Sequence, residues 1–382
     1  MSLLISQDLL SQIEKIYIHD ESWSSELAER VRSVFSSEKI ERVAKAPLQN
    51  VKGELTAKQF NQSKRLLYIT PFKGHFFKRC PGATQKKVLN CCNYHVLNLG
   101  LQCNMNCSYC YLQSYINTPT MTLYSNIDSA LVELEEMAEL HSDQPFRVGT
   151  GEVIDSLSMD DLSLFSRKLI PFFKKYPKWT LEFKTKSAKV DQFLDLAHAG
   201  NVVVSWSINP AYLIEKEEHG TARFQERIEA AKKCRDRGFK VAFHMDPLIY
   251  HPEWKKNYSE LVDVLSSEFT PEQVHIISLG ALRFQSDQRH MMRERFGLSS
   301  LVTSAEMHQS DGGKLRYDWR LRNEMFQFVI GHFKNKDPKW NTFLCMETPE
   351  SWISSYQSMP MKVDGLQTLF KPLPKIKSEK IL

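Results

Sequence analysis

Between residues 95 and 279 the chain alternates short apolar runs with longer amphipathic segments. The apolar runs are six to eight residues long and rich in β-branched and aromatic side chains, a pattern that predicts buried strands. These strands are expected at 95–101, 145–150, 179–185, 201–208, 240–245 and 274–279. Apolar positions at helical spacing predict helices at 126–141, 158–176, 188–199, 222–238 and 252–268.

Six strand–helix units in series predict an α/β protein with a parallel sheet and right-handed crossovers. The near-regular spacing favours a partial (β/α)6, TIM-like barrel over a doubly wound sheet. In both folds the chemistry belongs at the carboxyl ends of the strands. We expect residues 1–90 to form a basic N-terminal extension, 91–284 the partial barrel, and 285–382 a closing segment that ends in a loose basic tail.

Composition places the chain among ordinary soluble globular proteins. It has 382 residues, of which 42% are apolar and 25% charged, values typical of that class. The N-terminus shows no basic leader, and no apolar run reaches 18 residues, so neither a signal peptide nor a membrane anchor is expected. Eight cysteines, three of them in one motif, favour a reducing cytoplasm over a disulfide framework.

Positive charge is concentrated before the predicted barrel. The net charge is only +5, yet residues 42–90 hold eleven lysines and arginines against one glutamate. Aromatic residues are interleaved with these charges: Phe60, Tyr68, Phe72, Phe76 and Phe77. The block fits contact with a polyanion such as DNA. A solvated face that balances the acidic segment 127–161 fits the charge pattern equally well.

The most informative motif directly follows the first predicted strand. Cys103, Cys107 and Cys110 have the spacing C-x3-C-x2-C, and three thiolates on one loop suit three irons of a [4Fe–4S] cluster. Ferredoxin-type carriers supply four cysteines, so the fourth iron here is open to S-adenosylmethionine. The spacing resembles that of the radical S-adenosylmethionine superfamily. The alternative is a zinc site, which normally closes a tetrahedron with cysteine pairs or added histidines.

Small and polar residues follow the next strands. Gly149, Gly151 and Glu152 end the second strand, where glycines let a ligand approach the backbone and the carboxylate can accept hydrogen bonds from an ammonium group. This resembles the Gly-Gly-Glu motif that holds the amino group of S-adenosylmethionine. At later strand ends, Lys186 offers a cation for a carboxylate, and Ser207 and Asn209 offer hydroxyl and amide groups for a ribose or a carboxylate. Asp246 offers an acid for a ribose hydroxyl. Each is also a common helix cap or turn residue.

Longer stretches narrow the resemblance. Five segments resemble the spore photoproduct lyase family. They are the cysteine loop through Gln113, Thr185-Lys186, Ser207-Ile-Asn209, residues 227–231 and residues 247–254. Such a resemblance implies a partial barrel that reverses a thymine–thymine ultraviolet lesion in DNA, with electrons from a small reductant such as flavodoxin or ferredoxin. It also implies that Lys186, Ser207 and Asn209 contact S-adenosylmethionine, and that Tyr109 and Tyr111 return the radical to the cofactor.

One departure from that family concerns the hydrogen donor. The family carries a hydrogen-donating cysteine at the end of strand two, and residues 149–155 contain none. Cys80, Cys91 and Cys92 are either buried small side chains, substitute donors, or part of a second metal site, and Cys345 has no assigned role. For Arg283, Arg316 and Arg322 the choices are phosphate contacts or ordinary salt bridges.

Two other functions stay open on the sequence. The first is a radical S-adenosylmethionine enzyme that acts on a nucleotide, a tRNA or a peptide, and the missing cysteine sustains it. The second is a non-catalytic iron–sulfur or zinc protein that binds nucleic acid.

Overall fold

The computed structural model describes residues 5–47, 53, 55–80, 89–90, 92–298, 300–310, 313–359 and 363. Several sequence expectations lie outside the described residues, namely those for Cys91, for Lys52, Lys86 and Lys87 of the basic block, and for the tail after residue 370.

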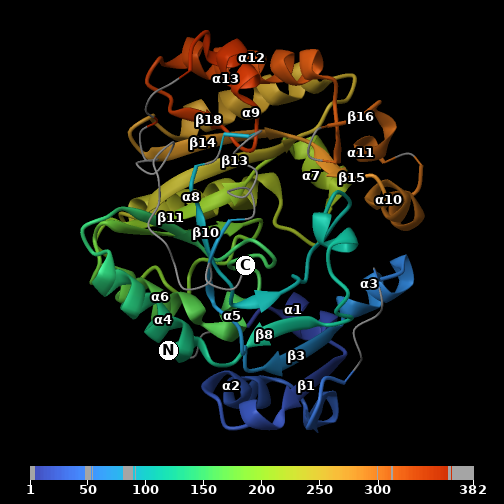
Figure 1. The fold of residues 1–382 in the computed structure, drawn as a ribbon, viewed down its shortest axis with the longest axis vertical. Coiled ribbons are helices and arrows are strands. Elements are labelled where there is room, and N and C mark those ends of the chain that lie inside the picture. Colours follow the sequence, from blue (N-terminus) through green and yellow to red (C-terminus); the bar gives the residue numbers. More distant parts are fainter. Residues whose placement is uncertain are drawn as a thin grey trace.

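The largest sheet contains a strand at each of the six predicted places, in the order in which they occur along the chain (Figure 1). Of the strand predicted at 95–101, only residues 95–97 belong to this sheet, and residues 100–101 form β6 of a second sheet. The six strands are β5 (His95–Leu97), β9 (Phe146–Gly149), β10 (Trp179–Thr185), β11 (Val202–Ser207), β13 (Lys240–Leu248) and β14 (Val274–Ala281). Each is parallel to the next. The sheet curls into a half-barrel, as the strand spacing predicted. Its edges are β4 (Phe77–Arg79), antiparallel to β5, and β18 (Thr342–Leu344), parallel to β14.

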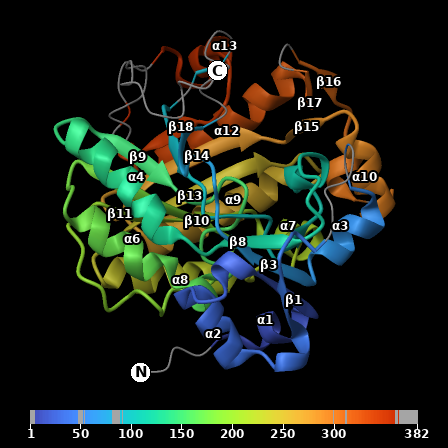
Figure 2. The ribbon, with the colours of Figure 1, turned by 60° about the horizontal axis from the view of Figure 1, so that its bottom comes forward.

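Helices connect most of these strands, and Figure 2 shows α4, α6 and α8 side by side along the sheet. The bounds are α4 (Ile127–Leu140), α5 (Asp160–Ser163), α6 (Phe165–Lys174), α8 (Phe224–Asp236) and α9 (Trp254–Glu268). The helix predicted at 158–176 is interrupted because Leu164 adopts a left-handed conformation, φ 53°.

The helix predicted at 188–199 is wrong. Instead of a helix, this connection is a series of turns, in which the Phe193 N–H donates to the Val190 carbonyl and the Leu196 N–H donates to the Phe193 carbonyl. Val190 and Phe193 are both fully buried. The turns therefore bury the same apolar side chains that produced the helical pattern.

A second sheet unites the N-terminal residues with segments on both sides of the cysteine loop. Its order is β2 (Ile40–Val43), β1 (Lys15–His19), β3 (Leu66–Thr70), β8 (Met121–Tyr124) and β6 (Gly100–Leu101). Strands β6 and β8 pair antiparallel, so the 19 intervening residues form a loop whose two ends are fixed next to each other. Three short N-terminal helices pack around this sheet: α1 (Gln7–Gln12), α2 (Glu26–Val34) and α3 (Ala57–Ser63).

Of the C-terminal elements, α12 and α13 lie at the opposite end of the molecule from the N-terminal sheet, whereas α10 lies beside α3 (Figure 1). The helices are α10 (Gln288–Phe296), α11 (Leu301–Ser304), α12 (Trp319–Lys336) and α13 (Pro349–Tyr356), and the strands are β15 (Arg283–Gln285), β16 (His308–Gln309) and β17 (Lys314–Arg316). One contiguous core includes Ile16, Trp206 and Trp352, so side chains from all three expected regions pack together. The division at residues 90 and 284 stays a prediction.

No helix among the described residues is both long and apolar enough to cross a membrane.

Candidate active site

The cysteine loop lies at the carboxyl ends of the barrel strands and is held from three sides. Cys107 is on β7 (Asn106–Cys107), which pairs antiparallel with β12 (Glu218–His219). The Lys64 ammonium donates to the Cys103 carbonyl at 2.6 Å, and the Gln288 amide donates to the Cys110 carbonyl at 3.2 Å. Backbone carbonyls away from water need such partners, so the N-terminal and C-terminal segments fix the shape of the loop.

The three thiols suit a metal cluster because of their chemistry and surroundings. Burial raises the pKa of Cys107 well above its usual range, and the neighbouring Cys110 and Cys103 raise it further, while Lys186 lowers it. No three His, Cys, Asp or Glu side chains in the described part of the chain are placed together as a site for one metal ion, so the fit to a cluster rests on the chemistry of the donor set. Thiolate ligands are formed by metal binding itself, and nearby cations from Lys64 and Lys186 offset their charge. The donor set fits a three-thiolate [4Fe–4S] site.

Tyr109 and Tyr111 point in different directions. The Tyr109 hydroxyl donates to the carboxylate of Glu218, inside the site. Tyr111 is 43% exposed, and its hydroxyl donates to the Glu152 carbonyl at 2.6 Å. Tyr111 thus joins the cysteine loop to the segment after β9, whereas Tyr109 joins it to β12.

The glycines after β9 are in close contact with the protein itself. A Cβ at Gly149 would lie 1.5 Å from the Tyr94 hydroxyl oxygen, and one at Gly151 would lie 2.8 Å from the Lys184 carbonyl oxygen. Close packing therefore explains both glycines without a ligand. Glu152 is half-buried, and burial raises its pKa. Binding of S-adenosylmethionine by these three residues stays a prediction.

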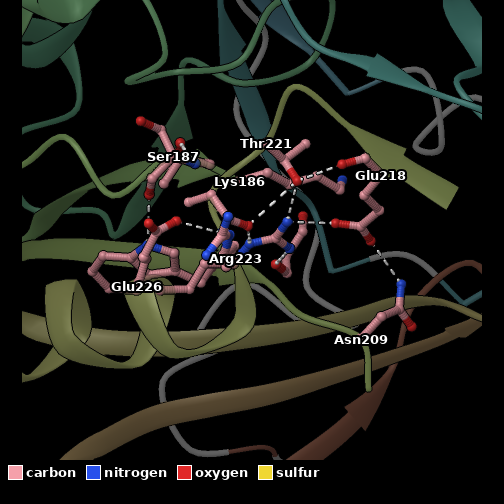
Figure 3. Close-up of polar contacts among 12 residues, drawn as sticks. Lys186, Ser187, Asn209, Glu218, Thr221, Arg223 and Glu226 are labelled. Atoms are coloured by element: carbon pink, nitrogen blue, oxygen red, sulfur yellow. Dashed lines mark hydrogen bonds and ion pairs between the residues drawn. The ribbon is translucent and has the colours of Figure 1, made fainter. Parts of the chain in front are cut away.

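Lys186 and Asn209 lie near Glu218 (Figure 3), a residue that the sequence did not single out. The Asn209 amide donates to the Glu218 carboxylate at 3.0 Å. Arg227, the first residue of the 227–231 stretch, donates to the Ser207 carbonyl at 2.8 Å and lies 2.6 Å from the Glu218 carboxylate. The Lys186 ammonium lies 5.6 Å from the centre of the Tyr109 ring.

Asp246 is at the other side of the barrel opening, in an ion pair. Both of its carboxylate oxygens accept hydrogen bonds from Arg283, at 3.0 and 3.2 Å. Although burial raises it, the pKa of Asp246 is lowered to about 2 by Arg283 and Lys184. Arg316 and Arg322 likewise pair with the buried Glu347, at 3.2 and 3.5 Å. All three arginines are therefore in salt bridges, the default for such residues.

Comparison with known proteins agrees with this geometry. The family model described as spore photoproduct lyase matches residues 12–326, well over half of the chain. This chain belongs to the spore photoproduct lyase family. Its relatives include the spore photoproduct lyases of Geobacillus sp. (strain Y412MC61), 25% identical over 69% of this chain and 73% of the relative, and of Bacillus subtilis (strain 168), 24% identical over 80% and 86%.

Solved structures of spore photoproduct lyase share the fold. A double mutant with bound AdoMet and dinucleoside spore photoproduct gives a TM-score of 0.74 at 22% identity, over 88% of this chain and 99% of that one. The enzyme complexed with dinucleoside spore photoproduct gives 0.73, also at 22% identity, over 87% and 98%. The half-barrel predicted from the strand pattern is thus the fold of this family, which belongs to the radical S-adenosylmethionine superfamily.

Three cysteines outside the cluster motif lie at the barrel opening. The Cys80 N–H donates to the Tyr94 carbonyl at 2.9 Å, and the Cys345 N–H donates to the Leu279 carbonyl at 2.7 Å. Cys80 and Cys92 both act electrostatically on Tyr94, and Cys92 also acts on Cys345. Cys80 directly follows β4, Cys92 precedes β5, and Cys345 directly follows β18.

A second group of charged residues lies inside the barrel, and the family resemblance did not predict it. Glu182 on β10 is 1% exposed, lies 2.7 Å from Arg147 on β9, and accepts a hydrogen bond from His244 on β13 at 2.8 Å. Charged residues at inward positions of apolar strands are the signal that predicts such a cluster, since buried charges require partners.

Two cations of the basic block are paired with acids in the turn that follows β1. Arg42 pairs with Asp20 at 2.6 Å and Lys73 with Glu21 at 3.0 Å. These are exposed pairs, and such pairs contribute only about 0–1 kcal/mol. Their cations therefore stay available for exchange onto phosphates, and the DNA role of the block stays a prediction.

The burial of His244 inside the barrel predicts acid destabilisation. Burial and the charge of Lys184 lower the pKa of His244 to about 4, despite its hydrogen bond with Glu182. Because the unfolded histidine titrates near 6.5, the native state binds fewer protons over this interval, so stability falls as the pH drops from about 6.5 to 4. The loss attributable to His244 is on the order of 3 kcal/mol.

Urea unfolding at several pH values measures this effect. The His244→Asn variant is expected to lose less stability than the wild type between pH ~6.5 and 4. The exposed His308→Asn variant is the control and should follow the wild-type curve. An equal loss of stability in the wild type and in His244→Asn would contradict the assignment of this effect to His244.

Proposed function

We propose that this protein is a radical S-adenosylmethionine enzyme that reverses a thymine photolesion in DNA. The observation that carries the proposal is the three-thiol loop at the carboxyl ends of a half-barrel, in a chain whose residues 12–326 match the spore photoproduct lyase family. The dinucleoside spore photoproduct bound by a structural relative supports this substrate class. The free thiols of the described cysteines support a reducing, cytoplasmic location.

The proposed roles of the residues follow from their places. Cys103, Cys107 and Cys110 would ligate a [4Fe–4S] cluster, which when bound supplies the electron that cleaves S-adenosylmethionine into methionine and a 5′-deoxyadenosyl radical. Lys186 and Asn209 would bind S-adenosylmethionine from the ends of β10 and β11.

Other groups would complete the cofactor site. Gly149, Gly151 and Glu152 would border the cofactor from β9, with Ser207 and Asp246 at later strand ends. Tyr109 and Tyr111, on either side of Cys110, would return the radical to the cofactor.

Two macromolecular partners accompany this proposal. Damaged DNA would be bound with help from the 42–90 block, whose exposed cations can exchange onto phosphates. A small reductant such as flavodoxin or ferredoxin would deliver the electron.

The direct test is an anaerobic assay of reconstituted protein with S-adenosylmethionine, dithionite and a spore-photoproduct dinucleotide, read by mass spectrometry. We expect 5′-deoxyadenosine together with thymidine dinucleotide. The Cys107→Ala variant should lose the cluster and both products, because one of three thiolate ligands is removed. Deoxyadenosine without repaired dinucleotide would contradict the lesion assignment and favour a nucleotide, tRNA or peptide substrate. One bound zinc and no cleavage of S-adenosylmethionine would contradict both the lesion assignment and the alternative enzyme substrates.

A thiol at the barrel opening is proposed to replace the family cysteine that is missing after β9. An S–H bond is weak, so a thiol can give its hydrogen atom to a product radical and become a thiyl radical. Burial and Asp246 raise the pKa of Cys345 to about 12, so this thiol keeps its proton. Cys80 and Cys92 are the other described candidates beside Tyr94.

Single alanine variants of Cys80, Cys92 and Cys345 test this role. For the donor, we expect repaired dinucleotide to fall at least about tenfold, which corresponds to about 1.4 kcal/mol, while deoxyadenosine formation continues. Cys234→Ala is the matched control, because Cys234 is buried in α8. Wild-type repair by all three variants would exclude these thiols.

A further inference from the structure

Glu218 occupies the junction between the cysteine loop and the strand ends (Figure 3). It lies opposite Cys107 in the β7–β12 ladder. Its side chain is fully buried, as is that of Arg227, its ion-pair partner at 2.6 Å. One carboxylate oxygen accepts hydrogen bonds from both the Tyr109 hydroxyl and the Asn209 amide. A single side chain thus contacts the loop, β11 and α8.

The partners of Glu218 are themselves fixed. Asn209 also accepts a hydrogen bond from the Tyr258 hydroxyl at 3.1 Å, and Arg227 donates to the Thr221 hydroxyl at 2.7 Å and to the Ala222 carbonyl at 2.9 Å. The Asn209 amide and the Arg227 guanidinium therefore have few alternative positions as long as the carboxylate is present.

Two cations, Arg227 and Lys186, act on the Glu218 carboxylate. Burial raises the pKa of Glu218, but these two cations lower it by more, so Glu218 is ionised. The Lys186 ammonium has no hydrogen-bond or ion-pair partner of its own among the described residues that the structure records. Asp155 also acts on Lys186, but its carboxylate accepts hydrogen bonds from the Thr185 hydroxyl and the Lys186 backbone N–H. The ammonium is therefore able to donate to the carboxylate of a ligand.

We infer that Glu218 is a positioning residue, which holds Lys186, Asn209 and Tyr109 in place for S-adenosylmethionine. The inference rests on the proposed function, since it takes Lys186 and Asn209 as contacts of that cofactor. One oxygen of Glu218 accepts from Tyr109 and Asn209, and the other faces the Arg227 guanidinium in the ion pair. Glu218 therefore acts through these residues and not by touching the ligand.

The charge of Glu218 is what the Glu218→Gln variant removes. The amide has nearly the same shape, but its N–H groups face the donors of Arg227 or Asn209, and two buried cations lose their counter-charge. We expect the variant to take up iron and sulfide as the wild type does, because none of the three thiol ligands changes. The dissociation constant for S-adenosylmethionine should rise at least about tenfold, the loss expected for misplaced hydrogen bonds to a charged group.

Electron paramagnetic resonance of the dithionite-reduced protein provides the readout. S-adenosylmethionine is titrated into wild type, Glu218→Gln, Glu218→Asp and Glu226→Gln. The last is the matched control, because Glu226 is exposed and only caps α8 through the Arg223 N–H. The spectral change should need far more cofactor in Glu218→Gln, occur normally in Glu226→Gln, and be partly rescued in Glu218→Asp, which keeps the charge.

A variant in which both partners become neutral separates positioning from folding. Replacing one member of a buried ion pair is strongly destabilising, whereas replacing both is often tolerated. The double variant Glu218→Gln with Arg227→Gln is therefore expected to fold and bind iron but still bind S-adenosylmethionine weakly. Wild-type affinity in Glu218→Gln or in the double variant would overturn the inference. If the wild-type protein binds iron but shows no spectral response to S-adenosylmethionine, the proposed function itself is wrong.

Discussion

The hydrogen bonds that fix the backbone of the cysteine loop are the constraint on which the active site depends. Lys64 at the end of α3 donates to the Cys103 carbonyl, and Gln288 from α10 donates to the Cys110 carbonyl. Strand β12 pairs with the strand that carries Cys107. These partners are distant in sequence from the loop. The N-terminal extension and the closing segment are therefore structural parts of the active site, and the barrel alone does not define the geometry of the three thiols.

Buried ion pairs distinguish this barrel from an apolar one. Arg147 with Glu182, Arg227 with Glu218, and Arg316 with Glu347 are each almost inaccessible to solvent. Removing one partner of such a pair typically destabilises a protein by about 3–5 kcal/mol, and a well-packed apolar substitute is often no less stable. These ion pairs contribute by orienting side chains, because each charged group in them faces one particular neighbour. The proposed site, which would hold a charged cofactor beside a cluster, requires that rigidity.

The strand pattern was sufficient to predict the half-barrel, because a buried parallel strand leaves a continuous apolar run in the sequence. The connection at 188–199 shows the limit of the same reasoning: Val190 and Phe193 are spaced as in a helix, but consecutive turns bury them equally well. The cysteine motif was equally local, so its position after the first strand was predictable. Glu218 was not, because its partners come from Tyr109, Asn209 and Arg227, and no short motif records contacts between three separate elements.

Charge counts along the chain were the weakest guide. The lysines and arginines of the 42–90 block form a uniform run in sequence, yet Arg42 and Lys73 pair with acids on the surface while Lys64 is buried against the Cys103 carbonyl. The same residue type thus has two physical roles that sequence alone does not separate.

The central claim is that S-adenosylmethionine binds directly to an iron that no protein thiol occupies. Electron–nuclear double resonance of the reduced protein with isotopically labelled S-adenosylmethionine measures this contact. The account predicts hyperfine coupling from the amino nitrogen and the carboxylate oxygen of the cofactor to the cluster. A full iron–sulfur cluster with no coupling from either label would contradict it.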